Sequence, residues 1–342
     1  MGMHTTRQNR MSNFELLRIV AMLLVMFGHS HMRIYPFPTE ATISQHSVVS
    51  FVEIMTGCFS TMGVGIFVAI SGWFGIRFKV EGLLKYVFQV LFVLWSIYGV
   101  AILFDITELN TTGLKISMGF YEGYWFVISY LGLYLLSPVL NSFIENTSKR
   151  TFQTVLLSLM LFQCYFSWLT AWYDYYNGYS IVLFSIIYLT AAYFRKYPMA
   201  WIERYAPWLL AAVISTMAVI ATTSLWQFGH AARQIRDDNP LVILATILLL
   251  LCFKKLRFQS KTINWLAASC FSVYLIHFNP FVYPYLMSAI RNVYSQYDGI
   301  AYGIMFLLLL LATYIACTVI DQVRIFTWNG LNFLKDYNKK LC

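Results

Sequence analysis

The first hydrophobic stretch of the chain reads Phe14-Glu-Leu-Leu-Arg18-Ile-Val-Ala-Met-Leu-Leu-Val-Met-Phe-Gly-His29. Extended a few residues at each end, it reaches the ~20 residues that a helix needs to cross a bilayer. Arg18 and His29 are eleven positions apart, and at ~100° per residue eleven steps end ~20° past three full turns. Both side chains therefore leave one face of the predicted helix, about 16 Å apart along its axis.

Ionisable groups inside a membrane are costly and usually line a cavity or a pathway, so this face indicates a functional site. Glu15 precedes Arg18 by three residues, which favours an ion pair that would fix the guanidinium. The alternative is structural: Glu15 and Arg18 anchor the helix at the membrane interface, and His29 is a packed residue.

The whole chain has the composition of a membrane protein. Its 342 residues are 59% hydrophobic and 11% charged, whereas a soluble domain carries roughly a quarter charged residues. We therefore predict one all-α integral membrane domain over residues 1–342 and exclude soluble multidomain classes. Apolar runs predict ten spans, near 12–31, 51–74, 83–104, 124–143, 152–170, 179–194, 207–225, 240–256, 268–289 and 301–322.

The positive charge of the chain follows the predicted topology. With a cytoplasmic N-terminus, eighteen Lys and Arg residues fall in inside segments. The outside loops hold only five: Arg33, Lys115, Arg233, Arg236 and Arg291. This is the positive-inside pattern, and it predicts cytoplasmic N- and C-termini. The net charge of +9 therefore indicates orientation rather than a nucleic-acid partner.

His29 suits general-base chemistry, because an unperturbed histidine accepts a proton near neutral pH. His31 lies ~200° around the helix from it, so the two rings cannot hold a metal through one face. No C-x-x-C pair, P-loop or G-x-S-x-G elbow occurs in the sequence. We therefore predict no metal site.

Several further residues are candidates for binding. Ser71 is a polar step at the end of the second span, followed by Arg77 and Lys79. Those two cations would suit phosphates, although positive-inside topology explains them equally well.

On the predicted outer side, Trp172 belongs to an aromatic-rich loop, and Tyr124 and Trp125 open the fourth span. Such residues suit a sugar, the alternative being an interfacial aromatic belt. His277 on the ninth span is a further candidate, although a lone histidine there is more often packed and hydrogen-bonded.

Together these motifs resemble the acyltransferase-3 family of integral membrane O-acyltransferases. The first is Arg-x10-His with an acidic residue three places before the Arg. The others are an aromatic-apolar-Ser-Gly run, a Trp-Phe span opening, a Leu-Tyr-Leu-Leu-x-Pro segment and a Ser-x-Tyr-Leu-Ile-His segment. In this chain they are Glu15, Arg18 and His29, then Phe67 to Gly72, Trp125 with Phe126, Leu133 to Pro138, and Ser272 to His277.

The resemblance implies transfer of an acyl group, commonly acetyl, from cytoplasmic acyl-CoA to a hydroxyl of an extracytoplasmic or lipid-linked polysaccharide. It implies a bacterial cytoplasmic membrane, and essential residues at His29 and Arg18, with Glu15 beside them. A phosphopantetheine arm is of the right order to cover the ~16 Å between them. Pro280 stands three residues after His277, whereas the family often places proline directly after this histidine.

The expected donor contacts are Arg18, Ser71, Arg77 and Lys79, and the expected acceptor contacts are Tyr124, Trp125, Trp172 and His277. Two roles stay open for His29, which either deprotonates the acceptor or carries the acyl group itself. Two other classes of protein also fit the composition. One is a polysaccharide or lipid-linked sugar exporter or flippase, and the other is a structural or sensory protein. Binding of CoA would separate the enzyme from both.

Overall fold

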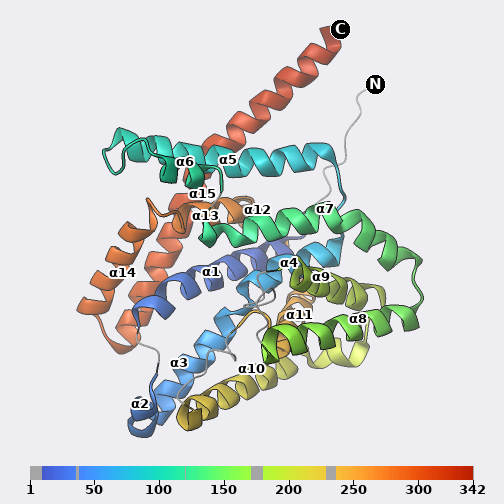
Figure 1. Ribbon diagram of the computed structural model, residues 1–342, viewed down its shortest axis with the longest axis vertical. Helices are drawn as coiled ribbons and strands as arrows, with labels where there is room; N and C mark the ends of the chain where they lie inside the picture. The colour runs from blue at the N-terminus through green and yellow to red at the C-terminus, as the bar shows by residue number, and fades with distance from the viewer. Residues whose placement is uncertain (1–9, 36–37, 120, 171–179, 229–235, 342) are drawn as a thin grey trace.

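The computed structural model describes residues 10–35, 38–119, 121–170, 180–228 and 236–341, and these form helices with no strand (Figure 1). Within these described residues, seven helical stretches are long and apolar enough to cross a membrane: Ser12–Ile34, Ser47–Phe74, Val80–Leu103, Thr111–Asn146, Lys149–Leu169, Ala200–Phe228 and Gly299–Leu331. The chain is therefore an all-α, polytopic membrane protein.

The elements follow one another along the chain as α1 (Ser12–Ile34), α2 (Glu40–Gln45), α3 (Ser47–Ser60), α4 (Met62–Phe74), α5 (Val80–Leu103), α6 (Thr111–Ser117), η1 (Glu122–Tyr124), α7 (Trp125–Asn146), α8 (Lys149–Gln163), η2 (Cys164–Leu169), α9 (Ile181–Lys196), α10 (Ala200–Phe228), α11 (Pro240–Lys254), α12 (Lys261–Ala267), α13 (Cys270–His277), α14 (Tyr283–Gln296) and α15 (Gly299–Leu341).

The predicted ninth span, 268–289, is not one helix. It is interrupted after His277, and α14 begins only at Tyr283. Pro280 causes the break, because proline lacks an N–H group and disfavours the helical conformation of the residue before it. The side chain of Asn279 then caps the turn by accepting a hydrogen bond from the Phe281 N–H at 2.9 Å. His277 consequently lies at the end of a helix rather than in its middle.

Other predicted boundaries also shift. The span predicted at 207–225 begins earlier, so Pro207 lies inside α10, and the last helix continues beyond 322 to Leu341. The spans predicted near 179–194 and 240–256 correspond to the shorter helices α9 and α11, of 16 and 15 residues.

α1 lies at the centre of the bundle, between two clusters of buried side chains (Figure 1). Phe14, Leu17 and Ala21 face the first cluster, with α3, α4 and α7 to α11. Ile19, Met22 and Met26 face the second cluster, with α5 and α12 to α15. Each set recurs at helical spacing and occupies one side of α1. Arg18 and His29 lie on the stripe between the two sides, where the clusters meet.

One glycine sets how closely two helices of the first cluster approach. A Cβ built on Gly72 would lie 2.2 Å from the backbone oxygen of Tyr188, so α4 and α9 pack backbone to backbone at this point. The Tyr188 hydroxyl donates to Asn141 on α7 at 2.7 Å and accepts the Ile76 N–H at 2.8 Å. These contacts fix α4 against α7 and α9, and α4 and α7 supply one wall of the cavity described next.

Candidate active site

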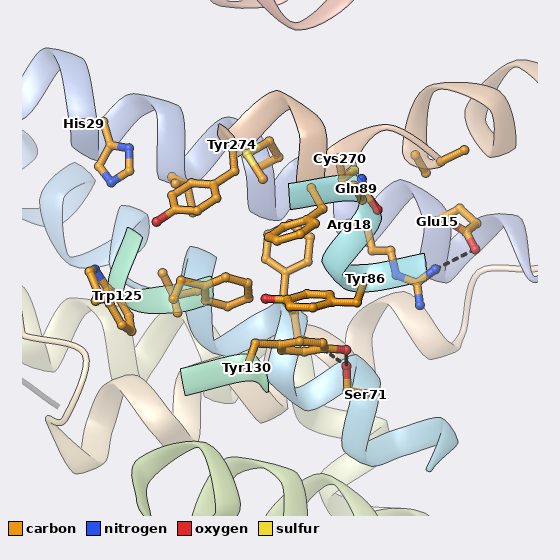
Figure 2. A pocket seen from close by; sticks show the side chains of 18 of the residues that line it. Glu15, Arg18, His29, Ser71, Tyr86, Gln89, Trp125, Tyr130, Cys270 and Tyr274 are labelled. Atoms are coloured by element: carbon orange, nitrogen blue, oxygen red, sulfur yellow. Dashed lines mark hydrogen bonds and ion pairs between the residues drawn. The ribbon is translucent and has the colours of Figure 1, made fainter. Parts of the chain in front are cut away.

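A cavity of about 370 Å³ follows α1 from Arg18 to His29. Its walls come from α1, α4, α5, α7, the end of α12 and α13 (Figure 2). Arg18 and His29 both line it, and Figure 2 shows their side chains at opposite ends. The helical spacing between Arg18 and His29 therefore corresponds to the length of this cavity.

The Arg18 end of the cavity carries the positive charge. Arg10 and Arg18 are its two cationic lining residues among those described. Arg18 Nη1 contacts Glu15 Oε1 at 2.7 Å, and the Glu15 side chain is 7% exposed against 34% for Arg18. The buried carboxylate therefore orients a guanidinium that remains accessible from the cavity, because no other described residue accepts a hydrogen bond from Arg18.

The middle of the cavity is a column of aromatic rings. Tyr86 stacks on Phe271 with centroids 5.2 Å apart, and Tyr130 stacks on Phe126 at 5.5 Å. The Tyr130 hydroxyl is 2.9 Å from Ser71 Oγ, and the Tyr86 hydroxyl donates to the Val127 carbonyl at 2.8 Å (Figure 2). These hydrogen bonds hold the rings in place. The column suits a long, narrow ligand with both apolar and amide groups.

His29 is held by its neighbours in one defined orientation. Its ring stacks on Phe278 with centroids 3.9 Å apart, and its Nδ1 lies 3.1 Å from His277 Nε2. His277 is 1% exposed, and its Nδ1 lies 2.7 Å from the Val273 carbonyl, four residues earlier on α13. His29 and His277 are 248 positions apart in the sequence, so only the fold brings them together.

The two contacts of His277 determine where the protons are. A carbonyl only accepts, so Nδ1 of His277 carries the proton and its Nε2 is an acceptor. Nδ1 of His29 must then donate to that Nε2. A neutral His29 consequently has its lone pair on Nε2, and no other described side chain is recorded within hydrogen-bonding distance of this atom. This arrangement presents an oriented base or nucleophile to the cavity.

The remaining predicted site residues divide into four groups. Ser71 and Trp125 line the cavity. Tyr124 is fully buried behind it, where its hydroxyl donates to the Leu275 carbonyl at 3.2 Å and accepts from Asn279 Nδ2 at 3.0 Å. Arg77 and Lys79 are exposed past the end of α4 and do not line the cavity. Trp172 lies outside the described residues.

Sequence reasoning missed several lining residues, among them Arg10, Tyr86, Gln89, Tyr130 and Tyr274. Four of the five lie away from α1. Tyr274 belongs to the Ser272 to His277 motif, which did not mark it as a lining residue, and only the packing of α5 and α7 against α1 identifies Tyr86, Gln89 and Tyr130. Among the described residues, no group of three or more His, Cys, Asp or Glu side chains is placed to hold a metal ion.

A comparison with protein families identifies the family of this chain. The model of the acyltransferase-3 family, described as an acyltransferase domain, matches residues 11–321. Comparisons with curated protein sequences and with solved structures gave no match. The matched region contains every helix that lines the cavity, including the Arg18 and His29 positions of α1. A match over most of the sequence shows that this membrane protein belongs to the acyltransferase-3 family.

Proposed function

We propose that this acyltransferase moves an acyl group, acetyl foremost, from cytoplasmic acyl-CoA to a hydroxyl of an extracytoplasmic or lipid-linked glycan. It would do so in the cytoplasmic membrane of a bacterium. The observation that carries the proposal is the oriented His29 ring in a cavity whose opposite end carries Arg10 and Arg18. The distribution of Lys and Arg in the sequence supports a cytoplasmic position for the Arg18 end.

The cavity suits the parts of acyl-CoA in order. Arginine binds phosphate well because its planar guanidinium presents several donors, so Arg10 and Arg18 suit the diphosphate. The pantetheine arm would lie along the aromatic column past Ser71, with its amides near Tyr130 and Gln89. Its thioester would then reach His29, about three helical turns away. Arg77 and Lys79 remain predicted contacts for the nucleotide outside the cavity.

The proposed chemistry uses His29 as a general base. Its Nε2 takes the proton from the acceptor hydroxyl while the oxygen attacks the thioester carbonyl and forms the new C–O bond. The C–S bond breaks, and the CoA thiolate leaves and takes the proton back from His29, which regenerates the neutral ring. His277 accepts from Nδ1 throughout, and this contact stabilises the imidazolium while it exists.

Incubation of the purified protein in lipid nanodiscs with radiolabelled acetyl-CoA tests the donor and the route. With direct transfer, label appears in an added glycan acceptor and not in the protein when the acceptor is left out. Label trapped on the wild type and absent from a His29→Ala variant would replace the base mechanism with a covalent one. Failure of the wild type to bind CoA would contradict the proposed donor and favour an exporter.

Glycan mass analysis of cells with and without the protein tests the acceptor. We expect a hydroxyl-linked acyl mass that alkali removes and that is absent without the protein. An unchanged set of glycan masses in cells whose purified protein binds CoA would exclude a glycan acceptor.

A further inference from the structure

A second cavity adjoins the first at the His29 end. It has a volume of about 230 Å³ and shares His29, Trp125, Val25 and Val64 with the first. His29 therefore stands at the junction of two spaces and faces both. We call the second space the acceptor chamber. Its further lining residues are Leu24, Gly28, Met32, Gly57, Ser60, Thr61 and Asp237.

Asp237 is the one carboxylate among the described residues that line the chamber. It lies just before α11, in a turn whose other polar side chains are already engaged. Asn239 caps α11 by accepting the Leu241 N–H at 2.9 Å. Asp238 is fully buried and accepts from Arg236 Nε at 2.9 Å and from the Ser167 hydroxyl. These contacts fix the turn and leave Asp237 to face the chamber.

No side chain in the described part of the protein is recorded as donating a hydrogen bond to Asp237. Burial raises the pKa of its carboxyl from 3.8 to about 7; the charge of Asp238 adds to this effect and Arg236 opposes it. A half-buried carboxylate that receives no hydrogen bond from the described residues is costly for the fold, and such groups concentrate at functional sites. A ligand that donates hydrogen bonds would remove this cost.

The other polar groups of the chamber also accept rather than donate. The Ser60 hydroxyl donates to the Gly57 carbonyl and the Thr61 hydroxyl to the Cys58 carbonyl, each at 2.8 Å. Their protons are therefore committed, and only their oxygen lone pairs remain for a ligand. Nε2 of His29 is likewise an acceptor. Ser60, Thr61, Asp237 and His29 therefore all offer a ligand acceptors rather than donors.

These hydrogen-bond acceptors favour one class of ligand over another. An anionic group would meet the Asp237 carboxylate with no lysine or arginine among the described lining residues to offset it. A group rich in hydroxyls can donate to Asp237, Ser60 and Thr61 at once. Gly28 and Gly57 line the chamber without side chains of their own, and the Trp125 ring also lines it and suits packing against the apolar face of a sugar.

We propose that this chamber is the acceptor subsite, and that Asp237 holds an uncharged, hydroxyl-rich sugar unit with its reacting hydroxyl directed at His29. The inference rests on the proposed function and narrows its acceptor to a neutral sugar. Asp237 accepts a hydrogen bond from a hydroxyl beside the reacting one and takes no proton. The reacting hydroxyl gives its proton to His29 Nε2 as its oxygen attacks the thioester, and the proton then leaves with CoA.

Transfer from radiolabelled acetyl-CoA to simple glycosides tests the proposal. The probes are the neutral methyl glycosides of glucose, galactose, mannose and rhamnose, and the anionic methyl glucuronoside, which shares the glucose ring. The wild type should favour the best neutral glycoside over the glucuronoside by at least about tenfold in kcat/KM, the scale of one hydrogen bond to a charged group.

Asp237→Asn should raise the KM for that neutral glycoside by at least about tenfold and reduce the preference over the glucuronoside. The KM for acetyl-CoA should not change. Asp238→Asn is the matched control, because it removes the same charge one residue away. The asparagine keeps an oxygen acceptor that can hold the turn, so the position of Asp237 and the KM for the glycoside should be unchanged. The weaker contact with Arg236 should lower thermal stability.

Three results would overturn the inference without touching the proposed donor chemistry. They are an unchanged glycoside KM in Asp237→Asn, a wild-type preference for the glucuronoside, and a wild type that uses acetyl-CoA yet acylates none of the neutral glycosides. A wild type that neither binds CoA nor transfers acetyl would instead contradict the proposed function itself. A Thr61→Val variant gives an independent check, because it removes a second hydroxyl acceptor without altering charge, and it should weaken the neutral glycoside alone.

Discussion

The two spaces that meet at His29 differ in charge. The larger cavity carries Arg10 and Arg18 at its far end, whereas the acceptor chamber carries Asp237 and, among the described residues, neither lysine nor arginine. The first suits a ligand with phosphates, and the second suits a ligand with hydroxyl protons. A single histidine that faces both spaces suits a base that takes a proton from a neutral acceptor in the chamber while an anionic donor occupies the larger cavity.

Substitution of His29, which lies where the two spaces meet, should have the largest effect on activity. His29→Ala should lower kcat for acyl transfer by about 10²–10⁴, the usual contribution of a positioned general base. His31→Ala is the matched control, because His31 lies on another face of α1, 2.9 Å from the Tyr302 hydroxyl, and does not line either space. Equal activity in both variants, measured with radiolabelled acetyl-CoA, would remove His29 from the mechanism.

His277 should give the next largest effect, because it acts only through His29. A phenylalanine at this position cannot accept the His29 Nδ1 proton, so the ring loses its fixed tautomer. We expect His277→Phe to lower kcat by roughly 10²-fold with little change in either KM, and to alter the pH profile of kcat.

His277→Gln keeps a hydrogen-bond acceptor on the side chain and should recover part of the lost kcat. A purely structural role would instead lower the stability of both variants alike and leave the pH profile of the residual activity unchanged. Comparison of the two pH profiles therefore separates positioning from packing.

The contrast between α1 and the rest of the site shows what the sequence could predict. Arg18 and His29 belong to one helix, so helical periodicity alone placed them on one face, and the structure finds both on one cavity. The orientation of His29 depends on His277, and the chamber depends on Asp237. Contacts across hundreds of residues arise from tertiary packing and leave no periodic signal in the sequence.

The fold was predictable in class and less so in detail. Hydropathy predicted a polytopic helical membrane protein because the energetic cost of an unpaired backbone in lipid permits few alternatives. The prediction of one continuous helix for the ninth span was wrong, although the cause of the interruption was visible in the sequence as Asn279-Pro280. That interruption matters for the site, because it ends α13 at the residue that orients His29.

A smaller effect is expected at the phosphate end. Arg18→Ala should raise the KM for acetyl-CoA by about 10–30-fold, the scale of one charge-assisted contact. It should not change the KM for acetyl-pantetheine, which has the thioester arm without phosphates. Arg150→Ala, an exposed arginine at the start of α8, is the control. Loss of both donors alike in Arg18→Ala would assign Arg18 to the architecture of α1 instead.

The smallest expected effect is on the stability of the fold and concerns Asp237 in the acceptor chamber. The folded state holds the pKa of Asp237 near 7, above its usual 3.8, so the protonated carboxyl favours folding. The resulting penalty is absent below pH ~4, grows as the pH rises, and is complete above pH ~7. The charged neighbours of this carboxyl are Asp238 and Arg236, and the titratable group across the chamber is the neutral His29.

Asp237→Asn removes that penalty, so its melting temperature should exceed that of the wild type by about 2–4 °C at pH 8 and match it at pH 4. Differential scanning fluorimetry of the two proteins, compared at each pH, cancels the titrations that they share. A variant that is less stable at pH 8 would mean that Asp237 is already paired in the fold. The same substitution would then raise the acceptor KM by disturbing the turn before α11, rather than by removing an acceptor of sugar hydroxyls.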